Sequence, residues 1–352
     1  MSARLYRRML LMLLIFVLSL GGGYGVIKLQ QNRLQIPVNG ESETRQYVIP
    51  GGIPIGIYLE TEGVLVLGTE EIKAKDGTTV NPSKNLVKSG DYIVGIDKEE
   101  ISDKKELISA VKKLQETSVV LHLRRDEEYI DVKVHPGENE QGEYKLGIWV
   151  RDSAQGIGTV TYIKEDHSFG ALGHGIHDID TNELLEITEG TLYETSIQHI
   201  KKGKSGEPGG FEGVITYNNY NILGTISQNT EEGIFGKINR VDQILSDITP
   251  CLTADKDEID LGAATIRCSL NGTVKEYSVR IIGLDYYAKE VNKGIMIQVD
   301  DSELLEATGG IVQGMSGCPI IQNGKLVGAV THVLVNDPTK GYGIFIENML
   351  AH

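Results

Sequence analysis

The stretch GGIVQGMSGCPIIQNGKLVGAVTH, residues 309–332, decides the interpretation of the chain because it places one serine in the most permissive part of the backbone. Gly314 and Gly317 flank Ser316, and two apolar runs separated by a turn follow, as in a β-hairpin. The glycines allow a tight loop in which the N–H groups of Gly314 and Ser316 point into one small space. Attack on a peptide carbonyl requires such donors beside an exposed hydroxyl, so the pattern predicts a nucleophilic Ser316 with these two N–H groups as its oxyanion hole. A glycine-rich turn with an incidental serine is the alternative.

A serine nucleophile needs a base, and the chain offers eight histidines: His122, His135, His167, His174, His177, His199, His332 and His352. His174 stands out in FGALGHGIHD, where glycines on both sides let an imidazole emerge at the end of a strand. The spacing of His174 and His177 also admits a shared metal ion, but no third ligand is marked by comparable spacing. We therefore expect His174 to be the base, with no metal and no organic cofactor.

The acid that orients the imidazole should be an aspartate. Asp300 and Asp301 lie at the end of an apolar run, 16 and 15 residues before Ser316. Either Asp301 or Ser302 would equally cap the short helix that follows. Asp178 and Asp180 are rivals because they are close to His174 in sequence. The residues alone leave this choice open.

The chain divides into segments of different character. Residues 29–46 are polar and form a linker, and residues 47–136 contain strand-like runs and one amphipathic helix, which predicts a small α+β domain. After a polar boundary at residues 137–144, short apolar runs recur between glycines over residues 145–352. Many short strands with few helical stretches predict a β-sandwich or barrel there.

The N-terminus predicts a membrane segment. Arg4, Arg7 and Arg8 precede a span of 19 residues without charge, from Met9 to Ile27, which is long enough to cross a bilayer with the arginines inside. Residues 1–28 are therefore expected to anchor a globular part that lies outside the cytoplasm, and a cleaved signal peptide is the competing interpretation. The formal net charge of −15 argues against nucleic acid as a partner.

Residues 47–136 resemble a PDZ domain in the segment SGDYIVGIDKEEI and the amphipathic helix after it. The resemblance implies that Ile55, Gly56 and Ile57 form the carboxylate-binding loop, where inward N–H groups hold a peptide end and the peptide adds as a strand. Pro54 departs from the family pattern at the first position of that loop. This departure argues against capture of a peptide C-terminus and leaves open the binding of an internal segment or of a segment of this chain.

The run Gly-Met-Ser-Gly-Cys-Pro with its hairpin resembles the nucleophile loop of chymotrypsin-like serine peptidases, which implies a double β-barrel. Together with the membrane segment, the PDZ-like unit and FGALGHGI, it resembles the stage IV sporulation protein B (SpoIVB) peptidases. That resemblance implies Ser316 as nucleophile, His174 as base and Asp301 as acid. It also implies self-cleavage, and cutting of a membrane-bound inhibitor between the mother-cell and forespore membranes so that a sigma factor precursor is processed.

Three further alternatives stay open on sequence grounds. Cys318 stands where a serine is common in that family, and a thiol nucleophile is conceivable. Cys251 and Cys268 would form a disulfide or two buried thiols, of which the thiols are expected. Finally, the chain could be a non-catalytic PDZ adaptor with a degenerate peptidase fold.

Overall fold

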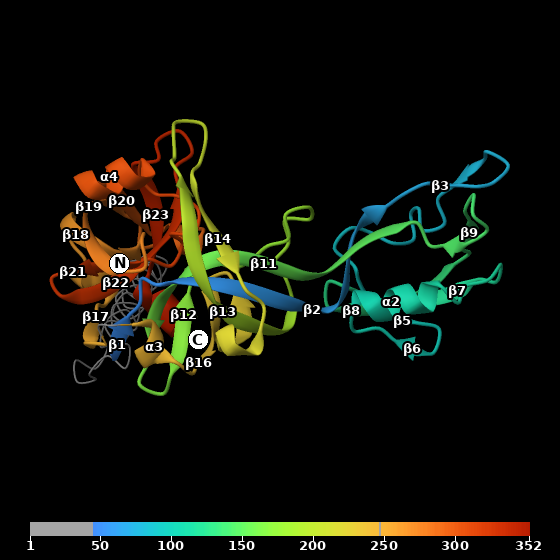
Figure 1. The fold of residues 1–352 in the computed structure, drawn as a ribbon, viewed down its shortest axis with the longest axis horizontal. Coiled ribbons are helices and arrows are strands. Elements are labelled where there is room, and N and C mark those ends of the chain that lie inside the picture. Colours follow the sequence, from blue (N-terminus) through green and yellow to red (C-terminus); the bar gives the residue numbers. More distant parts are fainter. Residues whose placement is uncertain (1–44, 246–247) are drawn as a thin grey trace, which may run out of the picture. The chain divides into compact units, whose positions relative to one another are not determined.

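The computed structural model describes residues 45–245 and 248–352, where strands predominate and the helices are short. Figure 1 shows these strands in their order along the chain. The predicted membrane segment, residues 1–28, and nearly all of the predicted linker, residues 29–46, lie outside the described residues. Among the residues that are described, no helix is long and apolar enough to cross a membrane.

The first barrel is closed by six strands of the described chain. Its ladders run from β2 to β11, β12, β16, β15 and β13 and back to β2, all antiparallel. Its core consists of inward side chains such as Ile57, Val160, Phe169 and Leu192, and each fully buried apolar side chain contributes roughly 1.5–3 kcal/mol. The strands are β2 (Pro54–Thr69), β11 (Ile148–Ile163), β12 (Ser168–Ala171), β13 (Ile187–Lys201), β15 (Ile222–Thr230) and β16 (Gly233–Ile238).

A second barrel is closed by six strands from the C-terminal part of the described chain. Its ladders run from β18 to β19, β20, β23, β22 and β21 and back to β18. Asn323 and Gly324 both have positive φ, as the tight turn between β21 and β22 requires. The strands are β18 (Gly262–Ser269), β19 (Val274–Leu284), β20 (Ile295–Val299), β21 (Pro319–Gln322), β22 (Lys325–Val333) and β23 (Lys340–Phe345).

Two short strands join the two barrels. The strand β1 (Tyr47–Pro50) pairs with β11 of the first barrel and with β17 (Cys251–Thr253), which runs parallel to β22 of the second. The helices of this part are α3 (Val241–Ile244), α4 (Ser302–Thr308) and α5 (Ile346–Leu350). Two barrels joined in this way agree with the predicted β-barrel class.

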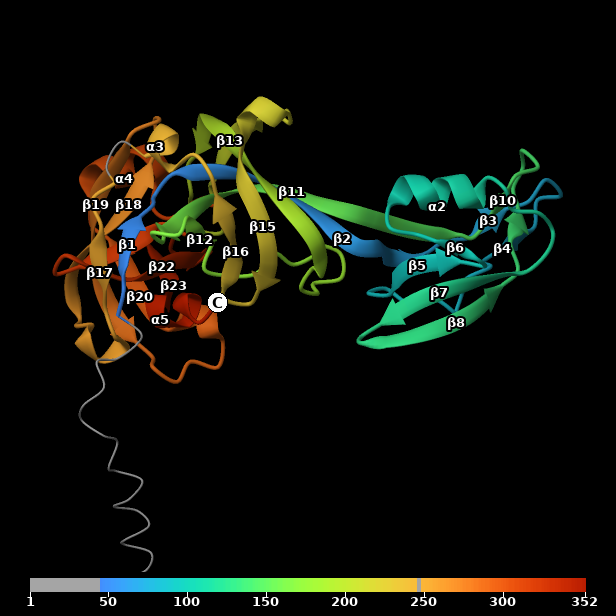
Figure 2. The same ribbon diagram turned by 90° about the horizontal axis from the view of Figure 1, so that it is seen from below.

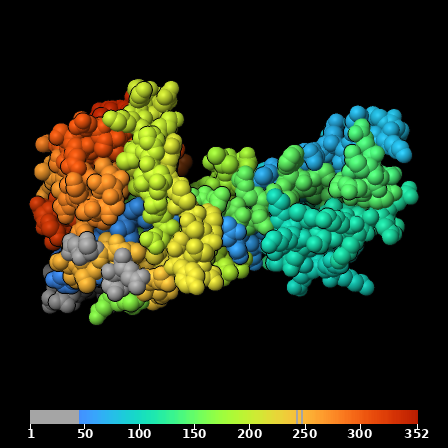
Figure 3. All heavy atoms as spheres, in the orientation of Figure 1, coloured from blue at the N-terminus to red at the C-terminus, as the bar shows by residue number. Residues whose placement is uncertain are grey.

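A hairpin connects the first barrel to the loop that carries Ser316. The strand β14 (Gly210–Ile215) pairs with the second half of β13, and Figure 3 shows this hairpin at the surface in yellow-green. At its base Gly210 forms a parallel bridge with Gln313. The hairpin therefore helps to position the backbone just before Ser316.

A small α+β module contains α2 (Lys104–Val111), which lies across its strands in Figure 2. Asp103 caps the helix by accepting a hydrogen bond of 2.8 Å from the N–H of Glu106, and Leu107 and Ala110 are buried against the strands. The strands are β3 (Ile72–Lys73), β4 (Thr79–Val80), β5 (Tyr92–Ile96), β6 (Glu99–Glu100), β7 (Val119–Arg125), β8 (Glu128–Val134), β9 (Gly137–Glu138) and β10 (Tyr144–Lys145).

The strand pairings place the domain boundaries differently from the predicted ranges 47–136 and 145–352. Along β2, residues up to Thr61 pair with β13 of the first barrel, and Val64 and Leu65 pair with β5 of the module. The strand β11 accompanies β2 through both parts. The module is thus an insertion between two strands of the first barrel, because 16-residue strands serve both cores.

Candidate active site

The loop of Ser316 requires both of its flanking glycines. Gly314 and Gly317 have φ values of +97° and +95°, a region that side chains disfavour. A Cβ on Gly317 would stand 2.0 Å from the carbonyl oxygen of Thr159, and one on Gly314 would stand 2.6 Å from the ring of Phe211. The glycines therefore let the loop pack closely against the first barrel.

Two N–H groups of this loop have no hydrogen-bond partner among the described residues. The N–H groups of Met315, Gly317 and Cys318 donate to carbonyl groups, whereas those of Gly314 and Ser316 do not. The carbonyl of Gln313 accepts a bond of 2.8 Å from the N–H of Phe211 in β14. Since the carbonyl and N–H of one peptide plane point in opposite directions, this bond turns the N–H of Gly314 away from Phe211. The pair of N–H groups predicted as the oxyanion hole is thus left free.

His174 stands three residues beyond the end of β12, after Leu172 and Gly173, whose φ values are +69° and +71°. Its Nδ1 lies 2.9 Å from the carbonyl oxygen of Gly175. A carbonyl only accepts, so Nδ1 carries the proton in the neutral ring and Nε2 keeps a lone pair. Burial lowers the pKa of His174 below its usual 6.5, which keeps the ring neutral at neutral pH.

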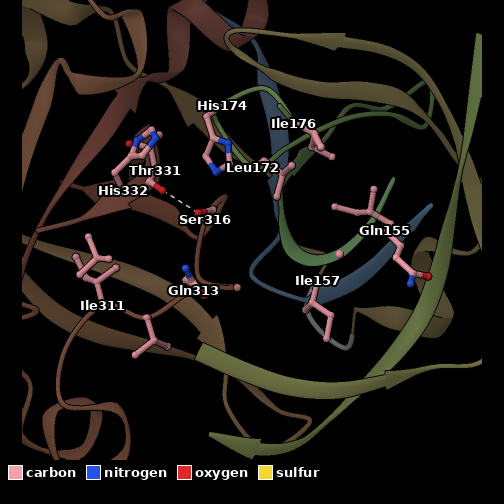
Figure 4. A pocket seen from close by; sticks show the side chains of 15 residues that line it. Gln155, Ile157, Leu172, His174, Ile176, Ile311, Gln313, Ser316, Thr331 and His332 are labelled. Carbon is pink, nitrogen blue, oxygen red and sulfur yellow. Dashed lines mark hydrogen bonds between the residues drawn. The ribbon is translucent and has the colours of Figure 1, made fainter. Parts of the chain in front are cut away.

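Ser316 and His174 line the same cavity, which has a volume of about 360 Å³. Figure 4 shows the side chains of both residues directed into this space. The Ser316 Oγ donates a hydrogen bond of 2.7 Å to the carbonyl oxygen of Thr331. Residues 57, 155–157, 172 and 176 of the first barrel form one wall, and residues 311–314 and 331–333 of the second form the other. The sequence prediction that the hydroxyl and imidazole meet, although they are 142 positions apart, is consistent with this shared cavity.

A second imidazole lies beside His174. His332, near the end of β22, has its ring centroid 5.1 Å from that of His174, with the ring planes inclined at 39°. Burial and the neighbouring His174 lower the pKa of His332 to about 4, and its Nδ1 is buried without a hydrogen-bond partner. Sequence reasoning counted His332 among eight histidines but did not select it, because a histidine in an apolar strand has no local mark.

The predicted acid, Asp301, does not reach His174. It caps α4, accepting bonds of 3.0 Å from the N–H of Leu304 and 3.2 Å from the N–H of Ser278. Asp300 accepts from the Ser278 hydroxyl at 2.6 Å. Nearness in sequence to Ser316 was misleading here, because α4 and the loop after it carry the chain away from the helix start.

The rival aspartates are also committed elsewhere. Asp178 is buried, forms an ion pair with Arg151 and accepts the N–H groups of Asp180 and Thr181. Asp180 pairs with the same Arg151 at 2.8 Å. Among the residues that the structure describes, no carboxylate is hydrogen-bonded to the ring of His174.

Ile55, Gly56 and Ile57 do not form a carboxylate-binding loop, so this prediction is wrong. They lie within β2, paired with β11 on one side and β13 on the other. Both isoleucines are buried in the first barrel. A strand with both edges paired offers no N–H groups to a peptide.

A different tripeptide of the same apolar-Gly-apolar pattern lies beside α2. Gly147 has φ +66°, and a Cβ there would stand 2.7 Å from the carbonyl oxygen of Glu70. The groove next to it has a volume of about 440 Å³. Its apolar lining comprises Ile72, Ile93, Leu107, Ile108, Val111, Leu146, Ile148 and Val150. The run KLGIWV, directly after the polar boundary, was the signal that could have identified this groove.

The cysteines and His177 occupy other environments. Cys251, Cys268 and Cys318 are free thiols, and Cys318 is fully buried behind the loop of Ser316. His177 lies 3.2 Å from the carboxylate of Glu231. Within residues 45–245 and 248–352, no group of three or more side chains is arranged to hold a metal ion.

The cavity between the two β-barrels is lined by a hydroxyl and an imidazole, with unpaired backbone N–H groups next to them. These are the features of a chymotrypsin-type serine peptidase. The profile of the SpoIVB peptidase S55 family matches residues 142–350, more than half of the chain. The chain therefore belongs to the SpoIVB peptidase family, a family of serine peptidases, as its sequence motifs indicated.

Several solved structures are similar to parts of this chain. One is the PDZ domain of the SdrC-like protein from Listeria monocytogenes, with 19% sequence identity and a TM-score of 0.21. The match covers 25% of this chain and 87% of that domain's chain. The active form of the Rv3671c protease from M. tuberculosis matches at 16% identity and TM-score 0.28, over 56% and 74% of the two chains. The HtrA-type protease AlgW with decapeptide matches at 11% identity and TM-score 0.33, over 85% and 62%. No curated protein sequence matches the chain.

Proposed function

We propose that the chain is a serine endopeptidase in which Ser316 is the nucleophile and His174 is the base. The observation that carries this proposal is that the Ser316 hydroxyl and the His174 imidazole line one cavity together with Gly314, and that the N–H groups of Gly314 and Ser316 have no hydrogen-bond partner among the described residues. Each part has a role in acyl transfer, and their coincidence in one cavity has no other evident use.

In the first step the Ser316 Oγ leaves the carbonyl of Thr331 and turns toward Nε2 of His174. The Oγ forms a bond to the carbonyl carbon of the substrate while its proton passes to Nε2, and the electron pair of the carbonyl moves onto the oxygen. The N–H groups of Gly314 and Ser316 donate to that oxyanion. His174 then gives the proton to the leaving amine, and water repeats the sequence on the acyl-enzyme.

The resemblance to the family supports a proposal for the biological setting. We expect residues 1–28 to anchor the protein to a membrane with the barrels outside the cytoplasm. Its expected substrates are the protein itself and a membrane-bound inhibitor, whose cleavage between mother cell and forespore would release processing of a sigma factor precursor. The groove beside α2 would hold an extended apolar segment of such a substrate and bring it to the enzyme.

The test is proteolysis by the full chain with and without its two reactive groups. The wild-type chain should cut itself and casein, whereas Ser316→Ala and His174→Ala should each reduce cutting by at least about 10³-fold with the fold retained. The matched control is Cys318→Ser, which changes a neighbouring side chain and should keep the activity. Undiminished cutting by Ser316→Ala would reject the assignment.

A second candidate function is a non-catalytic adaptor. The observations in its favour are that the Ser316 Oγ is bonded to the Thr331 carbonyl and that no described carboxylate supports His174. An adaptor would bind peptides in the groove beside α2 without cutting them. Covalent reaction of Ser316 with a fluorophosphonate separates the two functions, because only an activated serine reacts.

A further inference from the structure

Two of the three cysteines occupy facing positions behind the loop of Ser316. Cys268 is near the end of β18 and Cys318 directly precedes β21, and both side chains are buried in the core of the second barrel. The two strands pair antiparallel, with Ile266 opposite Ile320. Two residues further along the same register, Cys268 stands opposite Cys318.

The backbone bonds of Cys318 identify the type of this cross-strand position. Its N–H donates to the carbonyl of Met315 at 3.0 Å, and its carbonyl accepts from the N–H of Val330 at 2.9 Å. Both groups are engaged away from β18, so Cys268 and Cys318 form a non-hydrogen-bonded pair. At such positions the Cα atoms are about 4.5 Å apart and the side chains are closest. A disulfide spans Cα separations of about 4.4–6.8 Å, so the strand pairing brings the two thiols within bonding reach.

The surroundings of the two thiols agree with a direct contact between them. A hydrogen bond with the Cys318 thiol, together with burial, raises the pKa of the Cys268 thiol well above its usual value. Both cysteines are in the reduced form in this structure. Cys251, in β17, packs against a different apolar cluster and therefore serves as a control.

We propose that Cys268 and Cys318 are a modification site, a pair of thiols that closes to a disulfide and ties the end of the Ser316 loop to β18. The inference does not depend on the chemistry proposed for Ser316. It agrees with the expected location outside the cytoplasm, where disulfides form and persist. Since a serine is common in the SpoIVB family at the position of Cys318, the bond would be a property of this chain.

The oxidant that the reaction requires is a small disulfide. One cysteine thiolate attacks a sulfur of that disulfide, forms a mixed disulfide and releases one thiolate. The second cysteine thiolate attacks the mixed disulfide, forms the Cys268–Cys318 bond and releases the other thiolate. The two protons of the cysteines pass to the released thiolates, and the two electrons reduce the small disulfide, so the step is balanced. Because buried thiols react slowly, the exchange takes place while the second barrel is open, during folding or local unfolding.

The bond would act on stability and not on the reaction at Ser316. It closes a loop of about 50 residues that contains β19, β20 and α4, which restricts the unfolded chain. Neither cysteine is among the residues that line the cavity of Ser316. We therefore expect the oxidised chain to be more stable than the reduced chain and equally active.

The experiment compares the full chain, purified in a mild detergent, after incubation with reduced or with oxidised glutathione just below its melting temperature. Remaining thiols are alkylated in denaturant and located by mass spectrometry. Reduced glutathione should leave all three cysteines alkylated, whereas oxidised glutathione should leave only Cys251 alkylated and yield a peptide pair that joins Cys268 to Cys318. The oxidised chain should melt on the order of 5–15 °C higher. Both samples should hydrolyse p-nitrophenyl acetate equally fast at room temperature.

Two matched variants assign the effect to this pair. Cys318→Ser introduces the hydroxyl that is common in the family, and it should abolish both the joined peptides and the rise in melting temperature. Cys251→Ala removes the third thiol and should keep both.

The contrary outcomes are equally distinct. Three alkylated cysteines and an unchanged melting temperature after oxidised glutathione would show that the pair is only two packed thiols, and would overturn the inference. A disulfide that includes Cys251, or a glutathione adduct that persists on Cys268 or Cys318, would overturn it as well. Absence of ester hydrolysis in every sample would count against the proposed function and leave the disulfide unaffected.

Discussion

Two cavities of similar size lie in this protein, and their linings differ. The cavity at Ser316, about 360 Å³, is lined by a hydroxyl, two imidazoles and the residues Gly314 and Ser316, whose N–H groups are unpaired among the described residues. The groove beside α2, about 440 Å³, is lined largely by aliphatic side chains and backbone. The first combines a hydroxyl with imidazoles, as acyl transfer requires, whereas the second offers aliphatic side chains together with a few Glu and Lys residues and can hold an extended apolar segment. The volume of a cavity therefore does not show whether it serves catalysis or binding. The polar groups without hydrogen-bond partners in its lining distinguish the two.

The largest expected effect concerns the backbone of the loop that carries Ser316, at the first of the two cavities. Gly317→Ala would place a methyl group 2.0 Å from the carbonyl oxygen of Thr159, at a φ of +95°. We expect the loop of Ser316 to shift, with ester hydrolysis falling at least about 100-fold and stability falling by several kcal/mol. Urea unfolding and p-nitrophenyl acetate turnover measure both.

Gly324→Ala is the matched control for that substitution. Gly324 also has a positive φ, +76°, but a Cβ there meets nothing within 4 Å. It should cost about 1–2 kcal/mol from backbone strain alone and leave turnover unchanged. Equal losses of activity in the two variants would show that the loop at Ser316 has no special geometry.

The next largest expected effect concerns the groove beside α2. Ile108 lines the groove beside α2 and is 44% exposed, so Ile108→Asp puts a charge where an apolar segment would lie. We expect casein cleavage to become about tenfold less efficient through KM, while ester hydrolysis stays the same. Ser109→Asp, on the same helix but outside the groove, is the control. A parallel loss of ester hydrolysis would mean that the two cavities are not independent.

A third variant concerns the pH behaviour of the catalytic cavity. Because burial keeps the folded-state pKa values of His174 and His332 below 6.5, the unfolded chain takes up protons that the folded chain does not. The stability these rings contribute is full above about pH 6.5 and declines as the pH falls toward 4. Replacing His332 by Phe should flatten the decline of the unfolding free energy between pH 7 and 4.5, measured in urea titrations. An unchanged dependence of this free energy on pH would contradict the conclusion that His332 is buried as a neutral ring.

The smallest expected effect is that of Asp301→Asn. Asparagine caps helices about as well as aspartate, so stability should change by less than about 1 kcal/mol and kcat by less than about threefold. If Asp301 were the acid of a triad, the same change would lower kcat about 10⁴-fold. Measured kcat therefore decides between the cap in the structure and the acid implied by the family resemblance.

The sequence was sufficient to select candidate residues where a tight backbone requires glycines beside them. Ser316 and His174 were selected as candidates because glycines flank both of them, and the structure places both side chains at one cavity. Most strands of the two barrels were recognisable as short apolar runs, but β12 and β13 were not, and the segment of β2 was assigned to the PDZ-like domain. The resemblance to the SpoIVB family added what no local pattern could supply, namely that these two segments belong to one site.

The sequence did not suffice where tertiary pairing decides. Ile55–Gly56–Ile57 and the segment 146–148 share one pattern, yet the first is buried between two partner strands and the second borders the groove beside α2. Nothing local distinguishes them, because the difference lies in which strands pair with each. Asp301 and His332 were misjudged for the same reason: one is near Ser316 in the chain only, and the other is near His174 in space only.

The central claim is that Ser316 is an activated nucleophile, and mapping of a covalent adduct tests it most directly. The full chain is treated with a fluorophosphonate at neutral pH, digested, and analysed by mass spectrometry. The account predicts one phosphonylated peptide with the modification on Ser316, and its absence from His174→Ala. An unmodified Ser316 after prolonged exposure, or an adduct on Cys318 instead, would contradict it.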